Sequence, residues 1–189
     1  IELDVLMIWG MRFCVIALAL SLAGNALGQG LEQRVKAAYL VNFTRFIDWP
    51  PETKRGGEEA VEICVVGNRD IAIALSALIK SKPSRDVRIR SRLILLPEQS
   101  EGCDVLYLAD DSGELQRYWL QKLPQDHILT IADNGDFIDA GGMISFVIVS
   151  GKLRFDINQA NIHRSGMSVS SRLLSLARTV RRSAAKGSS

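Results

Sequence analysis

The sequence predicts an α/β fold: a three-layer sandwich with a largely parallel sheet and a C-terminal antiparallel hairpin plus helix. Three observations predict it. Short apolar segments alternate with helical segments between residues 61 and 132, the order that is typical of parallel sheets. Residues 143–149 alternate between two largely apolar faces, as in a strand that is buried on both sides. Residues 152–157 alternate again after the turn signal Ser150-Gly151, which predicts a hairpin that adds an antiparallel edge to the sheet.

The first 28 residues predict export. Residues 1–10 read as upstream of a start at Met11. After Met11 come one basic residue, an apolar run over residues 13–23 and the small-residue cleavage site Ala26-Leu27-Gly28. The run is shorter than the roughly 18 residues that span a membrane, which favours a cleaved signal peptide over an uncleaved anchor. We expect residues 29–182 to form a single domain and residues 183–189 a disordered tail.

Residues 31–48 predict the first helix of the mature chain. Its apolar residues are too numerous for one face. Two alternatives follow: the helix lies inside the fold, or it also exposes an apolar side to another chain. Trp49-Pro50 ends the helix, because the residue before a proline is disfavoured in helical conformation.

The middle of the chain alternates strands and helices. Strands are expected at residues 61–67, 87–96, 104–109 and 128–132. Asn68 or Asp70 is expected to cap a helix that ends at Lys82-Pro83, and Asp110-Asp111 to cap a second helix over about 111–121. Near the C-terminus, Ser168 or Ser170 is expected to cap a helix that covers the hairpin. Its apolar face would consist of Val169, Leu173, Leu176, Ala177 and Val180.

Two cysteines remain in the mature chain, Cys64 in the first expected strand and Cys103 at the start of the third. Neighbouring strands would place them within the range of a disulfide, and export favours its formation. The alternative is a pair of buried free thiols. A catalytic dithiol is not expected, because no Cys-x-x-Cys motif occurs.

No residues form a catalytic or metal-binding pattern, so we expect no enzyme and no cofactor. His127 and His163 lack ligand spacing, and residues 133–136 resemble a turn more than a calcium loop. The formal net charge is only +2, but no acidic residue follows Asp156, so the C-terminal end is basic. This end is read as a solvated helix end or as a contact for an anionic partner. Export argues against nucleic acid.

Two blocks of sequence resemble the YfiR/HmsC-like family. One is KAAYLVNFTRFIDWP at residues 36–50, and the other is GGMISFVIVSGKLRFDINQANIHRSGMSVSSRLLSLAR at residues 141–178. The resemblance implies a periplasmic, non-catalytic signalling regulator that binds and inhibits an inner-membrane diguanylate cyclase, and so lowers cyclic di-GMP and biofilm formation. It also implies a homodimer and sequestration by an outer-membrane lipoprotein. A sensor kinase is an alternative partner.

The expected partner surface consists of Tyr39, Leu40, Phe43, Phe46, Arg154 and Arg172. For Arg172 an ion pair with a carboxylate of the hairpin is expected ahead of a partner contact. A second hypothesis is a small-ligand receptor, because open α/β sheets bind ligands where their strands end. The segments Gly67–Asp70, Ala109–Ser112 and Asp133–Asp136 would then converge on the ligand.

Overall fold

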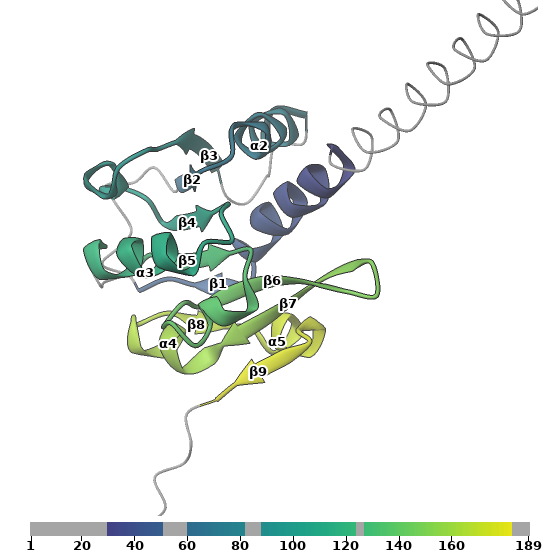
Figure 1. Ribbon diagram of the computed structural model, residues 1–189, viewed down its shortest axis with the longest axis vertical. Helices are drawn as coiled ribbons and strands as arrows, with labels where there is room; N and C mark the ends of the chain where they lie inside the picture. Colours follow the sequence, from purple (N-terminus) through teal and green to yellow (C-terminus); the bar gives the residue numbers. More distant parts are fainter. Residues whose placement is uncertain (1–29, 51–59, 82–87, 124–126, 183–189) are drawn as a thin grey trace, which may run out of the picture.

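The computed structural model describes residues 30–50, 60–81, 88–123 and 127–182. The predicted signal peptide and the predicted tail lie outside these residues. Seven strands form one sheet in the order β3-β2-β4-β5-β6-β7-β9 (Figure 1). All neighbours are parallel except the antiparallel pair β6–β7. The predicted α/β fold with a largely parallel sheet is therefore confirmed.

The centre of the sheet consists of β2 (Ala60–Val66), β4 (Val105–Leu108) and β5 (Leu129–Ala132), with β3 (Arg88–Leu93) at one edge of the described sheet. Alternate residues of these strands enter two separate apolar clusters. Ile63 and Val105 belong to one cluster, whereas Cys64 and Leu106 belong to the other. The runs that the sequence marks as apolar are buried on both faces, as parallel strands require.

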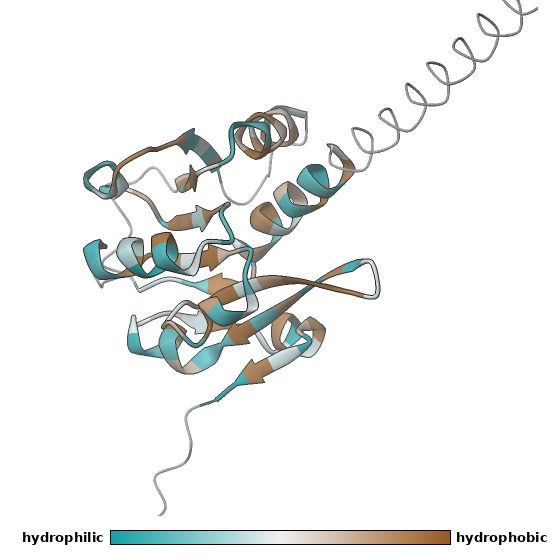
Figure 2. Cartoon of the chain, viewed as in Figure 1, coloured by the Kyte–Doolittle hydropathy of each residue, from teal (hydrophilic) through white to brown (hydrophobic). Residues whose placement is uncertain are grey.

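Helices cover both faces. Two helices pack on the face of the sheet that contains Ile63: the first helix (residues 30–43) and α2 (Arg69–Ser81). The helix α3 (Gly113–Lys122) packs through Trp119 on the opposite face, which contains Cys64. The 3₁₀ turn η3 (Gly135–Phe137) adds Phe137 to the second face. Figure 2 shows the apolar residues gathered along the strands and on the inner sides of the helices. No helix in the described ranges is long and apolar enough to cross a membrane.

Helix caps follow the sequence in part. The Asn68 side chain accepts hydrogen bonds from the backbone N–H groups of Asp70 and Ile71 at the start of α2, as predicted. The cap of α3 is Ser112 rather than Asp110 or Asp111. Asp110 instead accepts a hydrogen bond from the backbone N–H of Ser112, which fixes the turn before the helix.

The first helix is shorter than predicted. It ends at residue 43, and residues 47 and 48 form β1 (Ile47–Asp48), which pairs with β8 (Ser168–Val169). The predicted helix to residue 48 is therefore wrong at its end. In this pairing Ile47 lies opposite Val169, and both residues are buried in the core.

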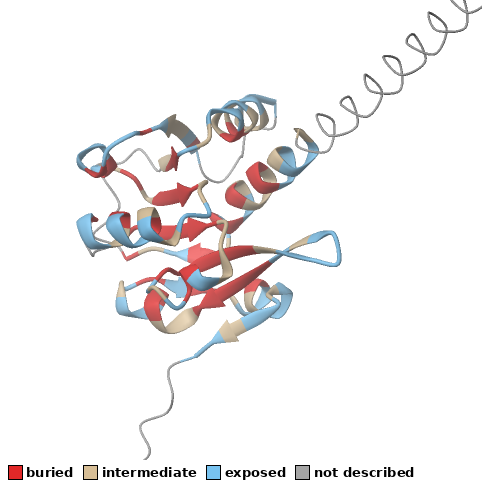
Figure 3. Cartoon of the chain, viewed as in Figure 1, coloured by how far each residue is buried: buried red, intermediate tan, exposed pale blue. Residues whose placement is uncertain are grey.

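The predicted hairpin is confirmed, but its outer half leaves the sheet. β6 (Ile144–Val149) and β7 (Lys152–Asn158) meet at Ser150-Gly151, where both φ angles are positive, as a tight hairpin turn requires. β5 pairs only with the first two residues of β6, and β9 only with the last three of β7. The tip therefore projects from the body and is exposed (Figure 3). The prediction that residues 143–149 are buried on both sides is wrong for Ile148 and Val149.

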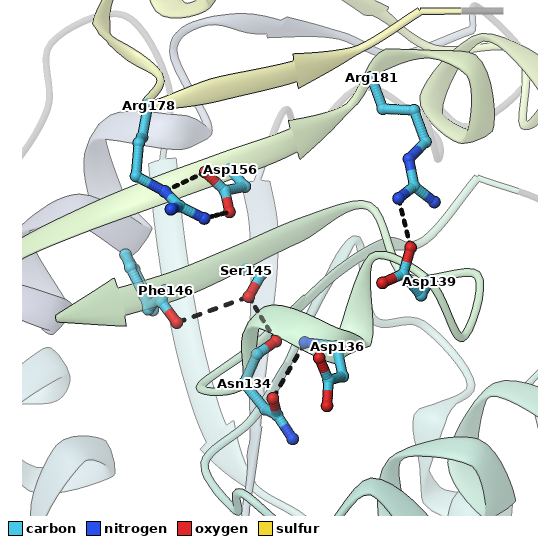
Figure 4. A network of polar contacts seen from close by, with 8 residues as sticks. All are labelled: Asn134, Asp136, Asp139, Ser145, Phe146, Asp156, Arg178 and Arg181. Atoms are coloured by element: carbon cyan, nitrogen blue, oxygen red, sulfur yellow. Dashed lines mark hydrogen bonds and ion pairs between the residues drawn. The ribbon is translucent and has the colours of Figure 1, made fainter. Parts of the chain in front are cut away.

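The predicted C-terminal helix is also wrong beyond residue 176. After α4 (Gln159–Arg164) and β8, Ser170 caps α5 (Ser171–Leu176), as expected of Ser168 or Ser170. The chain then becomes extended and forms β9 (Thr179–Arg181), which pairs parallel to β7, so Val180 lies in a strand and the hairpin is not the edge. Ion pairs of Arg178 with Asp156 and of Arg181 with Asp139 hold this strand in place (Figure 4).

Candidate functional site

A partly buried chain of polar contacts lies where β4 and β5 end. The amino group of Lys36 contacts Glu32 Oε1 at 2.6 Å and Asp133 Oδ2 at 3.0 Å. The hydroxyl of Tyr107 donates a hydrogen bond of 2.6 Å to Asp133 Oδ1. One carboxylate thus joins the first helix to the middle of the sheet.

Local structure places these four side chains. Tyr107 lies in the central strand β4, and a buried tyrosine hydroxyl needs a partner. Asp133 follows the last residue of β5, the strand next to β4, so its carboxylate lies beside that hydroxyl. Lys36 lies one helical turn after Glu32 on the first helix, which allows the (i, i+4) ion pair.

The network shifts two pKa values in the same direction. Burial, the proximity of Asp133 and its hydrogen bond all raise the pKa of the Tyr107 hydroxyl far above its ordinary value. Burial lowers the pKa of Lys36, but its contacts with Glu32 and Asp133 outweigh burial and raise the pKa above the ordinary value. Tyr107 is therefore neutral and Lys36 charged at neutral pH, so neither serves as a general base there.

A pocket of about 350 Å³ opens beside this network. Its polar wall carries four carboxylates and one amine: Glu32, Lys36, Asp110, Asp111 and Asp133. Its apolar wall comes from the hairpin residues Phe146, Val147, Ile148 and Leu153. Two of the three segments predicted to converge on a ligand, those around Ala109 and Asp133, line this pocket, whereas Gly67–Asp70 does not.

The hairpin tip forms the second feature of this region. The side chains of Ile148 and Val149 are 58% and 39% exposed, and Lys152 and Arg154 are exposed beside them. The first helix adds Leu31, which is 65% exposed. Glu32 and Lys36 of the same helix line the pocket that Ile148 also lines. We call Ile148, Val149, Lys152 and Arg154 the hairpin tip. It combines apolar area with positive charge.

The structure separates the residues that were predicted to contact a partner. Leu40 and Phe43 are 0% and 1% exposed and pack in the core, so in this fold they offer no surface to a partner. Tyr39 is half-buried, and its ring packs against Phe43 and two aromatic rings of the hairpin, Phe146 and Phe155. Only Arg154 lies on the hairpin tip.

Arg172 does not pair with a hairpin carboxylate. Its guanidinium lies 5.9 Å from the centre of the half-buried Phe46 ring, a cation–π distance. The hairpin carboxylate Asp156 is instead bound by Arg178. The predicted ion pair was thus assigned to the wrong arginine, because the chain turns extended after α5 and brings Arg178 to β7.

The predicted disulfide is present. Cys64 in β2 and Cys103 just before β4 are bonded, with their Cα atoms 5.8 Å apart. The bond lies in the cluster on the α3 face, away from the Lys36 network. A guanidinium nitrogen of Arg92 lies 3.2 Å from Cys103 Sγ and also donates to the Glu101 carbonyl, which ties β3 to the same corner.

The histidines have separate partners. His127 Nδ1 lies 2.9 Å from the Ser165 carbonyl, and His163 Nε2 lies near the Gln159 amide. Within the described ranges, no three His, Cys, Asp or Glu side chains are grouped to hold a metal ion.

Sequence reasoning missed Lys36, Tyr107 and the role of Asp133. Two signals were available: a single lysine in an otherwise apolar stretch of helix, and a tyrosine inside a buried strand. Each predicts a buried polar partner, but neither says which residue supplies it.

Comparison with known proteins identifies the family. The YfiR/HmsC-like family model matches residues 33–178, which is most of the chain. The chain belongs to the YfiR/HmsC-like family. Known members of the family are periplasmic repressors of diguanylate cyclases, and the family is regulatory rather than catalytic. The match contains most of the first helix, Cys64, Cys103 and the hairpin.

A solved structure is also similar to this chain: a conserved domain protein from Vibrio cholerae O1 biovar El Tor. The two share 15% sequence identity with a TM-score of 0.45. The similarity covers 63% of this chain and 54% of that one, so this chain spans about half the length of that protein.

Proposed function

We propose that this protein is a periplasmic regulator that binds the periplasmic part of an inner-membrane diguanylate cyclase and holds the enzyme inactive. The observation that carries the proposal is the family match over residues 33–178. The disulfide is compatible with an oxidising compartment. A homodimer and an outer-membrane lipoprotein that removes the repressor from the cyclase are part of the same proposal.

The hairpin tip supports this proposal as the contact surface. Beyond Phe146, β6 pairs only with β7 among the described residues. A two-stranded ribbon that lacks sheet neighbours is marginally stable in water. This ribbon nevertheless exposes Ile148 and Val149, which would be stabilised by burial against another molecule. We therefore expect the cyclase to bind the hairpin tip in an apolar groove. The rim of this groove would be acidic, complementary to Lys152 and Arg154.

A second surface is proposed at Arg172 and Phe46. The half-buried ring and the guanidinium above it offer an apolar and a charged contact together. We rank this pair below the hairpin tip as a partner surface, because Arg172 and Phe46 already contact each other within the chain.

The experiment that tests the function measures cyclic di-GMP in cells. Deletion of the gene should raise cyclic di-GMP, and expression of the chain with its signal peptide should restore the lower level. Affinity purification from solubilised membranes should recover a diguanylate cyclase with the chain. If deletion leaves cyclic di-GMP unchanged and the recovered partner is a sensor kinase, the cyclase is the wrong target.

The pocket beside Lys36 favours a second candidate function, a periplasmic sensor of a small ligand. Its four carboxylates and apolar wall suit a cationic ligand with an apolar part. A thermal-shift series with octylamine, octanol and octanoate tests this function. Stabilisation by octylamine that Asp110→Asn abolishes would support the sensor, and equal melting temperatures with all three would exclude it for this class of ligand.

A further inference from the structure

A second pocket, of about 560 Å³, lies on the α3 side of the sheet. It is bounded by α3, the turn before β6 and α4, so we call it the α3–α4 pocket. Its residues include Ile128 and Thr130 at the start of β5, so it lies at the opposite ends of the strands from the Lys36 network. Its volume falls in the range of about 300–1,000 Å³ that is usual for small-molecule sites.

The charged residues of this pocket are basic, whereas those of the pocket beside Lys36 are mostly acidic. Arg117 from α3 and Arg164 from α4 line it, and no Asp or Glu does so among the described residues. Neither arginine forms an ion pair with a carboxylate within the part of the chain that the structure describes. Two exposed arginines thus line one cavity that no carboxylate of the described chain lines.

Local contacts hold one of these arginines in place. The guanidinium of Arg164 donates to Asn161 Oδ1, and Asn161 Nδ2 donates to the Gly141 carbonyl at 2.5 Å. Asn161 is itself only 9% exposed, and its backbone N–H is bound by the side chain of Asn158. The position of Arg164 is therefore fixed by a chain of hydrogen bonds that starts in the core.

The floor of the pocket is apolar. Leu123, Ile128 and Met143 line it and are each 7% exposed, and Leu120 adds a half-buried side chain. Thr130 also lies on the floor, but its hydroxyl accepts a hydrogen bond from the backbone N–H of Met143. The floor therefore offers contact area for hydrocarbon, and the two arginines supply the charge.

We propose that the α3–α4 pocket binds a small organic anion with an apolar body. The anionic group is bound by Arg117 and Arg164, since guanidinium groups pair with carboxylate and phosphate oxygens through two parallel hydrogen bonds. The apolar body packs on Leu120, Leu123, Ile128 and Met143. The proposal does not depend on repression of a cyclase, and it places this ligand away from the carboxyl ends of the strands.

The test uses three probes with the same alkyl chain: octanoate, octanol and octylamine. Each is titrated into the mature chain with its disulfide intact, by calorimetry and by NMR of the Met143 methyl group. We expect octanoate to bind at least tenfold more tightly than octanol, and octylamine not to bind at this pocket. The Met143 methyl resonance should shift with octanoate. Octyl phosphate as a fourth probe tells whether the carboxylate or the phosphate is preferred.

Single substitutions then test whether Arg117 and Arg164 bind the anionic group. Arg117→Gln and Arg164→Gln should each weaken octanoate binding by about tenfold, the usual effect of losing a charge-assisted hydrogen bond. Arg117→Lys should weaken octanoate binding less than Arg117→Gln, because lysine keeps the positive charge. Arg45→Gln, an exposed arginine outside the pocket, is the matched control and should bind like the wild type.

Three results would overturn the proposal: equal affinity for octanoate and octanol, octanoate binding that neither glutamine variant weakens, or saturation without a shift at Met143. Failure of octanoate to bind would overturn it as well. None of these results affects repression of a cyclase, which is measured separately in cells. Melting curves of the variants confirm that each one is folded.

Discussion

Arg178 binds Asp156 through both arms of its guanidinium. Nε donates a hydrogen bond of 2.8 Å to Oδ1, and Nη2 donates to Oδ2 (Figure 4). The side chain of Asp156 is only 8% exposed, whereas that of Arg178 is 46% exposed. The pair joins β7 to the residue that precedes β9, so it anchors the last strand of the described sheet.

Loss of Arg178 should destabilise the fold more than loss of an ordinary surface arginine. Arg178→Ala leaves a buried carboxylate without its partner, which we expect to lower the free energy of unfolding by about 1–3 kcal/mol. The measurement is urea unfolding followed by circular dichroism. Arg181→Ala is the control, because it breaks an exposed pair with Asp139 and should cost less than about 1 kcal/mol.

A double-mutant cycle checks that the effect of Arg178 runs through Asp156. Arg178→Ala combined with Asp156→Asn should cost less than the sum of the single changes, because the second change removes the unpaired charge. Additive costs would show that the two residues act independently.

Tyr107 and Lys36 should set the alkaline limit of stability. Both pKa values are raised in the folded state, so the folded protein holds these protons more tightly than the unfolded chain. Their contribution is complete below the ordinary values, about pH 10, and is lost as the pH rises beyond them. The free energy of unfolding should therefore fall above about pH 10.

Tyr107→Phe isolates the tyrosine's part in that pH dependence. The variant should lose about 1–3 kcal/mol at pH 7, because Asp133 loses a hydrogen bond in a buried site. Its stability should also decline less steeply above pH 10 than that of the wild type. Tyr118→Phe, at an exposed tyrosine, should leave both quantities unchanged. An identical alkaline decline in the wild type and in Tyr107→Phe would contradict the assignment.

The disulfide should be a large part of the stability of the domain. It closes a separation of 39 residues, and removal of such a bond typically costs about 2–5 kcal/mol. Cys64→Ala combined with Cys103→Ala should lower the free energy of unfolding by that amount. The wild type in reducing agent should fall to a similar value, whereas the variant should not respond to the reducing agent.

The sequence predicts the centre of the sheet well, because strands buried on both faces consist of continuous apolar runs. Residues 63–66 of β2 and the whole of β4 are of this kind, and β5 is interrupted only by the buried Thr130. The cysteine pair could also be predicted, because Cys64 lies in β2, Cys103 lies just before the neighbouring strand β4, and both belong to the same cluster.

Other features depend on how far neighbouring elements extend, which a local pattern does not contain. Ile148 and Val149 belong to an apolar strand, but β5 ends before it can cover them. Val180 fits the helical period of the preceding residues, but the long-range pair of Arg178 with Asp156 favours an extended chain. The Lys36 network was missed because it joins distant parts of the chain: Lys36 and Asp133 are 97 residues apart.

We propose that the hairpin tip is the surface through which this protein represses a membrane diguanylate cyclase. Ile148 and Ile73 allow a matched test: both are isoleucines that are 58% exposed, one on the hairpin and the other on α2. Neither change should unfold the protein, because each replaces an exposed side chain.

The most direct measurement is the cyclic di-GMP concentration in a deletion strain that expresses either Ile148→Asp or Ile73→Asp at equal periplasmic levels. We predict that Ile73→Asp restores the low concentration and that Ile148→Asp leaves it as high as in the deletion strain. Full repression by Ile148→Asp would contradict the claim.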